Sequence, residues 1–153
     1  MSATFHVTIV LPKENVSGAS FVIVGDIFSS QRAYYNSLRK KIAQLEITNI
    51  EFIGYQEDIR LLLKGFDLFI CTSKSESGPM TLWEAMSMGK AVVSTNVGDV
   101  AKYVIPDYSG EIVPIGDAQA MTEKILELAL DKRKRLLIGK HARQIIVNNF
   151  DVS

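Results

Sequence analysis

The sequence predicts an α/β protein built on a doubly wound parallel sheet, and three observations support this. Short apolar runs alternate with amphipathic helical segments along most of the chain, which is the pattern of strands joined by crossover helices. The run at residues 20–25 is apolar almost throughout, as in strands that are buried on both faces of a parallel sheet. Gly25 and Gly54 each end a predicted strand, where the chain must turn tightly at the sheet edge.

Length and composition limit the alternatives. The 153 residues suffice for one domain with its own core. Hydrophobic residues make up 47% of the chain, and 17 basic and 17 acidic residues cancel, so no global field favours a nucleic-acid partner. The single cysteine, Cys71, falls in a predicted strand and suggests a buried thiol in a reducing compartment. No transmembrane or signal-peptide pattern occurs, so we expect a cytoplasmic protein.

The first two predicted strands cannot be joined by a crossover. Residues 4–11 are rich in β-branched side chains and residues 20–25 form the apolar run described above. Only about eight residues separate the two segments, whereas a parallel crossover needs a dozen or more. We therefore expect the two strands to pair as a hairpin, or the first segment to lie elsewhere.

The rest of the chain alternates regularly between helices and strands. A helix is predicted at residues 31–45, with Tyr34, Leu38 and Ile42 on its apolar face. A short helix begins near Asp58. Further strands are expected at residues 49–54, 66–72, 91–95 and 110–114, and further helices after Pro79, within residues 97–106, after Asp117 and at about 133–149.

Residues 73–96 are the stretch most informative about function. A short loop leads into a helix whose start is marked by Gly78 as N-cap and Pro79 at the first helical position. The first N–H groups of such a helix point toward its positive end. At the carboxyl edge of a parallel sheet they form a backbone anion site that suits a phosphate. The N–H groups concerned are those of Met80, Thr81 and Leu82.

Two carboxylates flank this helix start. Glu76 lies in the loop, and Glu84 lies one turn into the helix after seven intervening residues. Thr81, Glu84 and Ser87 are the polar positions within residues 80–88, and their spacing of three predicts one narrow polar stripe. The stripe alone fits the solvent-facing edge of a buried helix as well as a binding site. Glu76 alone fits a loop side chain in water.

The same stretch resembles the Glu-x7-Glu signature of the retaining glycosyltransferases with the GT-B fold, in their C-terminal nucleotide-sugar-binding domain. The resemblance rests on Glu76, Glu84, the Ala85-Met86 pair, Gly89 and the segment Val92-Val-Ser-Thr-Asn-Val-Gly98. It covers about residues 20–150, and residues 1–19 are atypical or truncated. It implies that residues 1–153 form a single Rossmann-like domain, one half of an enzyme whose missing N-terminal domain binds the acceptor.

The resemblance also implies roles for individual residues. Glu84 would accept hydrogen bonds from ribose hydroxyls, and Glu76 would act as the catalytic carboxylate beside the donor sugar. A UDP-, GDP- or ADP-linked sugar would bind without metal or cofactor, since the helix dipole and basic side chains meet the phosphate charge. Donor contacts are expected from Ser77, Gly78, Pro79, Met80, Thr81, Leu82, Gly25, Gly54 and Tyr55.

One departure from the family pattern leaves a second function open. The family's phosphate-clamping Arg and Lys follow the first strand of the domain, where this chain has Pro12-Lys13-Glu14. Lys13 does not match that motif. A non-catalytic Rossmann-like domain for interaction or nucleotide binding is therefore the alternative, and a titration with nucleoside diphosphates separates the two. A flavodoxin-like receiver domain is disfavoured, because Leu11-Pro12-Lys13 offers no acidic cluster.

Two further features carry weaker predictions. The basic run Lys132-Arg-Lys-Arg135 predicts a solvated face, with peripheral contact to an anionic membrane surface as the alternative. The histidines His6 and His141 have no partner at metal-ligand spacing, so no metal site is predicted.

Overall fold

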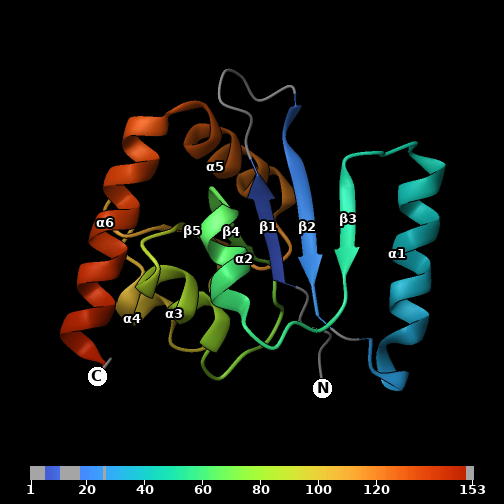
Figure 1. The fold of residues 1–153 in the computed structure, drawn as a ribbon, viewed down its shortest axis with the longest axis horizontal. Coiled ribbons are helices and arrows are strands. Elements are labelled where there is room, and N and C mark those ends of the chain that lie inside the picture. Colours follow the sequence, from blue (N-terminus) through green and yellow to red (C-terminus); the bar gives the residue numbers. More distant parts are fainter. Residues whose placement is uncertain (1–5, 11–17, 26, 151–153) are drawn as a thin grey trace.

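The structure is a computed structural model that describes residues 6–10, 18–25 and 27–150. These residues form one six-stranded sheet in the order β3-β2-β1-β4-β5-β6. Helices cover both faces of the part of the sheet that contains β4 and β5 (Figure 1). The strands are β1 (His6–Val10), β2 (Ser20–Val24), β3 (Ile50–Ile53), β4 (Leu68–Cys71), β5 (Ala91–Thr95) and β6 (Glu111–Val113).

Five of these strands run in one direction and β1 runs against them. The pairs β2–β3, β4–β5 and β5–β6 are parallel, whereas β1 pairs antiparallel with both β2 and β4. The predicted α/β parallel sheet is confirmed for the five strands, with β1 as the exception. The expected hairpin is also confirmed, in a register from His6 opposite Val24 to Val10 opposite Ser20. The short connection leaves no room for a parallel crossover.

The helices follow the predicted order. Asp58, Asp117 and Asp131 cap three of them, each accepting a hydrogen bond from a backbone N–H in the first turn. A single residue, Asp131, separates the last two helices, which turn sharply against each other. The helices are α1 (Arg32–Gln44), preceded by the 3-10 turn Ser29–Gln31, α2 (Ile59–Gly65), α3 (Met80–Ser87), α4 (Val100–Tyr103), α5 (Ala118–Leu130) and α6 (Lys132–Asn149).

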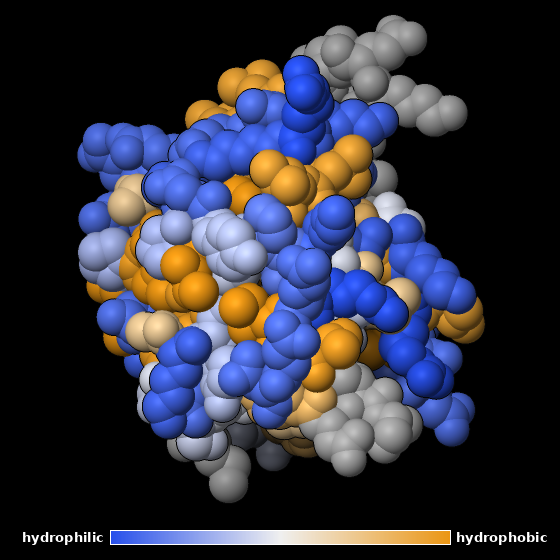
Figure 2. All heavy atoms as spheres, turned by 90° about the vertical axis from the view of Figure 1, so that its left-hand side faces the viewer, coloured by the Kyte–Doolittle hydropathy of each residue, from blue (hydrophilic) through white to orange (hydrophobic). Residues whose placement is uncertain are grey.

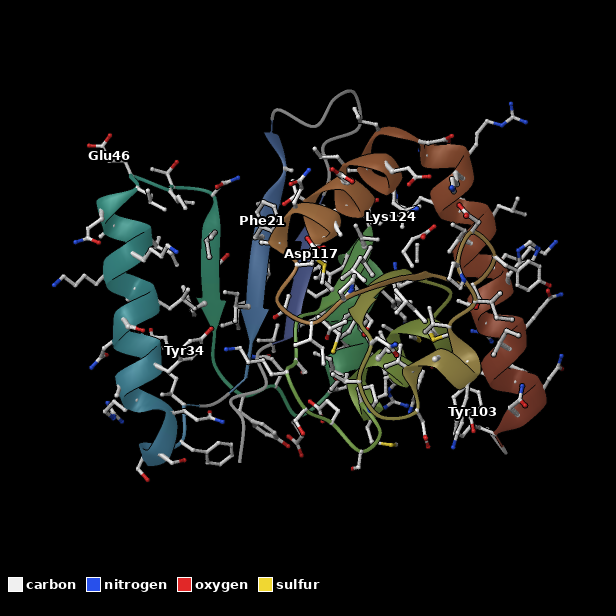
Figure 3. All side chains as sticks on the ribbon, turned by 180° about the vertical axis from the view of Figure 1, so that it is seen from behind. Phe21, Tyr34, Glu46, Tyr103, Asp117 and Lys124 are labelled. Atoms are coloured by element: carbon white, nitrogen blue, oxygen red, sulfur yellow. The ribbon has the colours of Figure 1, made fainter. Side chains whose placement is uncertain are left out.

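The core consists of two apolar layers, one on each face of the sheet. Alternate residues of β4 enter different layers: Phe69 and Cys71 join the layer with α2 and α3, and Leu68 and Ile70 join the layer with α5. Figure 3 shows α5, which begins after Asp117, crossing the face of the sheet that is turned away from the viewer in Figure 1. The central strands are therefore buried on both faces, as their continuous apolar runs predict.

The opposite end of the sheet is much less covered. Figure 1 shows α1 beside β3, at the end of the sheet, and no residue of α1 is buried. Its inner face contacts Phe52, whose ring lies 5.3 Å from that of Tyr35 and 5.2 Å from the Arg39 guanidinium carbon. Tyr34, predicted on the apolar face, is 54% exposed, and that prediction is wrong. The ring of Phe52 on β3 meets Tyr35 instead.

Candidate functional site

The loop between β4 and α3 is tied to the neighbouring strand. The Thr95 hydroxyl on β5 donates a hydrogen bond to the Ser73 carbonyl oxygen at 2.6 Å. The buried Ser73 hydroxyl in turn donates to the Glu76 carboxylate at 2.9 Å. Glu76 is half-buried. Glu76, which the sequence identified as a candidate site residue, is therefore held at the carboxyl edge of β4 by Ser73, which the sequence did not identify.

Gly98 brings a second loop directly against this one. A Cβ atom at Gly98 would lie 2.5 Å from the Ser77 carbonyl oxygen and 2.6 Å from that of Glu76. The φ angle of Gly98 is +49°, in the left-handed region that favours glycine. The turn after β5 therefore packs on the backbone of the Glu76 loop, and only glycine fits there.

Helix α3 begins one residue later than predicted. Pro79, rather than Gly78, is the N-cap, and Met80 is the first helical residue. The Leu82 N–H already donates to the Pro79 carbonyl oxygen at 2.9 Å, so the prediction that this N–H is available to a ligand is wrong. The reason is the tight first turn, in which the N–H groups of both Leu82 and Trp83 donate to the Pro79 carbonyl oxygen. The helix start itself still opens at the carboxyl edge of β4, with Met80 exposed.

The polar stripe of α3 is present. Thr81, Glu84 and Ser87 are half-buried. The positions between them are buried apolar residues: Leu82, Trp83, Ala85 and Met86. Burial raises the pKa of the Glu84 carboxyl, and the Arg60 charge partly opposes this shift. Hydrogen-bond donors from a ligand would stabilise the ionised form of such a carboxylate.

Arg60 is a residue that the sequence analysis missed. Its guanidinium binds Asp58 through two hydrogen bonds, at 2.9 and 3.2 Å, while the Asp58 carboxylate also caps α2. The charge of Arg60 also lowers the pKa of Glu84, against the larger effect of burial. The cap at Asp58 was predictable from sequence. The proximity of Arg60 to Glu84 depends on the packing of α2 against α3 and was not.

The remaining predicted residues lie at the ends of β2 and β3. The Gly25 N–H donates to the Ile53 carbonyl oxygen at 3.1 Å, and Gly54 and Tyr55 follow directly after β3, with Tyr55 67% exposed. Because β2, β3 and β4 run in the same direction, these strand ends and the Glu76 loop share one sheet edge. Strand β1 ends at the opposite edge, and Lys13 lies outside the described residues.

An acidic cluster lies elsewhere, at the start of β6. Carboxylate oxygens of Asp107, Glu111 and Glu127 lie within 4.8 Å of one another. Lys124 lies 3.1 Å from the buried Glu111, and Lys134 pairs with both Asp107 and Glu127. The two lysines balance much of the negative charge, so the cluster is an ion-pair network that joins β6 to α5 and α6.

A hollow of about 290 Å³ adjoins the sheet edge that carries Glu76. Thr72, Lys74 and Thr95 line it together with the first residues of α5. Neither Glu76 nor Glu84 lines it.

A search of the helices in the described ranges finds none with the length and hydropathy needed to span a bilayer.

A Rossmann-like sheet with a helix opening at its carboxyl edge defines a class of nucleotide-binding domain. The model of the family described as glycosyl transferases group 1 matches residues 8–145. The chain belongs to this family. The lipopolysaccharide core biosynthesis mannosyltransferase LpcC of Rhizobium leguminosarum is 25% identical over 84% of the chain. The N,N'-diacetylbacillosaminyl-diphospho-undecaprenol alpha-1,3-N-acetylgalactosaminyltransferase of Campylobacter jejuni is 30% identical over 82% of it.

Solved structures agree with this assignment. Anabaena HepE in complex with UDP superposes with a TM-score of 0.84 and 27% identity, covering 93% of this chain and 38% of that one. The C-terminal domain of the Francisella tularensis LpcC has a TM-score of 0.79 over 86% of this chain and 70% of that domain, and at 23% identity it supports the fold alone. The chain spans only 37% and 32% of the lengths of the Rhizobium and Campylobacter relatives.

Proposed function

We propose that the chain is the nucleotide-sugar-binding domain of a retaining glycosyltransferase of polysaccharide biosynthesis. The observation that carries the proposal is the placement of Glu76 and Glu84 on either side of the start of α3, at the carboxyl edge of the sheet. A diphosphate at that edge would meet the positive end of the α3 dipole. A buried thiol at Cys71 suits a reducing, cytoplasmic compartment.

Each carboxylate has a distinct proposed role. Glu84, partly desolvated on the polar stripe of α3, accepts hydrogen bonds from two ribose hydroxyls, which an acceptor-only group can do at once. Glu76, held by Ser73, lies beside the donor sugar, where its negative charge stabilises positive charge that builds up on the ring as the glycosidic bond breaks. Gly54 and Tyr55 form one side of the base site, and Gly25 lies at the neighbouring strand end.

A UDP-linked sugar is the first donor to test. The Anabaena HepE structures hold UDP, UDP-glucose, or UDP with glucose, and an Escherichia coli relative of 27% identity is named as a UDP-Gal-dependent transferase. The test is calorimetry with UDP, GDP and ADP in the absence of divalent metal. We expect dissociation constants of about 0.1–1 mM for the preferred nucleotide, because no basic clamp follows the first strand.

Transfer would require a second domain. The acceptor hydroxyl must be held against the sugar carbon, and such positioning accounts for about 7–11 kcal/mol of a barrier. We propose that an acceptor-binding domain, which relatives more than twice as long have room for, supplies this geometry. The measurement is a coupled assay for released nucleoside diphosphate. Acceptor-dependent turnover should occur only when a separately expressed acceptor domain is added, and turnover by residues 1–153 alone would contradict this proposal.

The second candidate is a non-catalytic domain that keeps the fold for interaction. The reversed direction of β1 favours it, because the clamp of the resembled family follows the first strand and β1 of this chain ends at the sheet edge opposite the Glu76 loop. The calorimetric titration decides between the candidates. Absence of binding to UDP, GDP and ADP at millimolar concentrations would favour the non-catalytic domain and overturn the donor-site proposal.

A further inference from the structure

The outer face of α6, near its start, combines exposed leucines with basic side chains. Leu136 and Leu137 are 60% and 53% exposed, and together with Arg133 and Lys140 they line a groove of about 730 Å³. Leu130, the last residue of α5, is 72% exposed. We call Leu130, Lys132, Arg133, Leu136, Leu137 and Lys140 the basic–apolar surface. Figure 2 shows this side of the molecule, with apolar patches among hydrophilic side chains.

The spacing of these residues separates them from the buried face of the same helix. Arg133, Leu136, Leu137 and Lys140 follow the i, i+3, i+4, i+7 pattern of one helical face. The buried residues of α6 follow the opposite face: Arg135, Ile138, Gly139, Ala142 and Ile146. The helix therefore has two faces with large apolar side chains, and only the inner one packs against α3, α5 and β5.

The structure divides the basic run at the start of α6 into two groups. Lys134 and Arg135 are ion-paired: Lys134 lines the groove but pairs with Asp107 and Glu127, and the buried Arg135 pairs with Asp67. Lys132, Arg133 and Lys140 are exposed, and among the residues that the structure describes they have no acidic partner. Asp131 is the one acid that lines the groove, and its carboxylate caps α6. The surface therefore carries a net positive charge.

We propose that the basic–apolar surface docks on an anionic lipid bilayer. We infer this occupant from charge complementarity, because three cations with no acidic partner among the described residues lie on the same surface as the exposed leucines. Lys and Arg stems lie along apolar surface while their charged heads reach phosphate groups, and leucines on such a face enter the boundary between headgroups and acyl chains. Each cation near an anionic surface adds to the attraction.

Docking at this surface leaves the proposed donor site free. The Nζ atom of Lys134, one turn from Leu137, lies 4.0 Å from Oε1 of Glu111, the first residue of β6. The Glu76 loop instead follows the carboxyl end of β4. The two sites are at opposite edges of the sheet. Membrane binding is therefore independent of nucleotide binding and can be measured without a donor.

The test is co-sedimentation of the chain with vesicles of phosphatidylcholine, with and without phosphatidylglycerol. We expect binding only to the phosphatidylglycerol vesicles, and loss of binding at high salt. Reversing two cations, in Arg133→Glu with Lys140→Glu, should weaken binding at least about 25-fold. Leu136→Ser should weaken it without changing its salt dependence. The matched control is Lys40→Glu with Lys41→Glu on α1, which changes the net charge equally and should leave most of the binding intact.

Three results would overturn the proposal. The first is equal partitioning of the chain to neutral and anionic vesicles, or to neither. The second is an equal loss of binding in the α1 control, which would show a general charge effect. The third is self-association in solution that Leu136→Ser abolishes while vesicle binding is absent, since a second copy would then be the occupant.

Discussion

Two regions of the sheet differ sharply in how they are held. In the central unit (residues 68–98), every residue of β4 and β5 is buried, and so are four residues of α3. In the edge unit (residues 32–53), neither α1 nor β3 has a buried residue. Stability within a protein follows the density of buried apolar contacts. The proposed catalytic carboxylate is thus built on the most firmly packed part of the chain, and the proposed base contacts follow the least covered strand.

The largest expected effect comes from shortening one leucine in each unit. Leu82 on α3 is fully buried, so Leu82→Ala should cost about 2–5 kcal/mol of unfolding free energy through lost burial and a cavity. Leu38 on α1 is only half-buried, so Leu38→Ala should cost about 1 kcal/mol or less. Urea denaturation followed by circular dichroism measures both. Equal losses would show that the edge unit is held as firmly as the central unit.

The second prediction concerns the contact between two loops of the central unit. Gly98→Ala should destabilise the protein by about 2–4 kcal/mol, because it adds left-handed strain to overlap with the Ser77 and Glu76 carbonyls. It should also weaken nucleotide binding by displacing the Glu76 loop. The control is Gly65→Ala at the end of α2, where a Cβ atom meets nothing within 4 Å. Thermal melts that rank the two variants equally would contradict the close packing at Gly98.

The order of strands and helices was predictable because it depends on local patterns. The alternation of apolar and polar residues identified the central strands and the helix after residue 79. Asp58 and Asp117 marked the starts of two helices, which they cap in the structure. The polar stripe with Glu84 followed from spacing on one helix. Such features depend on residues a few positions apart, where periodicity and capping chemistry act directly.

Other features depend on contacts between distant segments. Whether β1 pairs with β2 or lies elsewhere could not be decided from its own sequence, because strand pairing is set by neighbours far along the chain. The pairing of Lys134 and Arg135 depends on Asp107, Glu127 and Asp67, which lie far from them in the sequence or on another element. The shift of the α3 N-cap by one residue follows from hydrogen bonds to the Pro79 carbonyl, which no propensity indicates.

The third prediction tests whether Glu84 of the central unit serves binding or packing. Glu84→Gln keeps the shape of the side chain but removes a charged acceptor, so nucleotide affinity should fall by about 1.5–3 kcal/mol. Folding stability should stay the same or rise slightly at neutral pH, since burial raises the pKa of Glu84 and its ionised form costs stability above that pKa. Affinity for nucleotide should also fall as the pH drops through that raised pKa.

Calorimetry measures this affinity, with Glu51→Gln on the exposed side of β3 as the control for loss of one negative charge. Unchanged affinity in a destabilised Glu84→Gln variant would assign the residue a structural role. That result would also remove the main difference in function between the central unit and the edge unit.

The smallest expected effect comes from the ion-pair network that joins β6 to the two last helices. The hydrogen bonds from Lys134 lower the pKa of Asp107 and of Glu127 below their ordinary values of 3.8 and 4.5. A carboxyl whose pKa is lowered by folding stabilises the protein above its ordinary pKa, and this contribution is lost as the pH falls through the lowered value. Lys134→Met should therefore destabilise the protein at neutral pH, and the difference from the unmodified chain should shrink in acid.

The effect should remain smaller than the three above, because Asp107 is exposed, Glu127 is half-buried, and solvent screens such pairs. Urea denaturation at neutral pH and again below the ordinary carboxyl pKa range measures it, with Lys132→Met as the control for removal of an unpaired cation. If the Lys134→Met difference persists in acid, Lys134 stabilises the protein through the packing of its partly buried stem, and not through its ion pairs with the carboxylates. The ion-pair network would then contribute little to this half of the sheet through charge, because solvent screens pairs that are partly exposed.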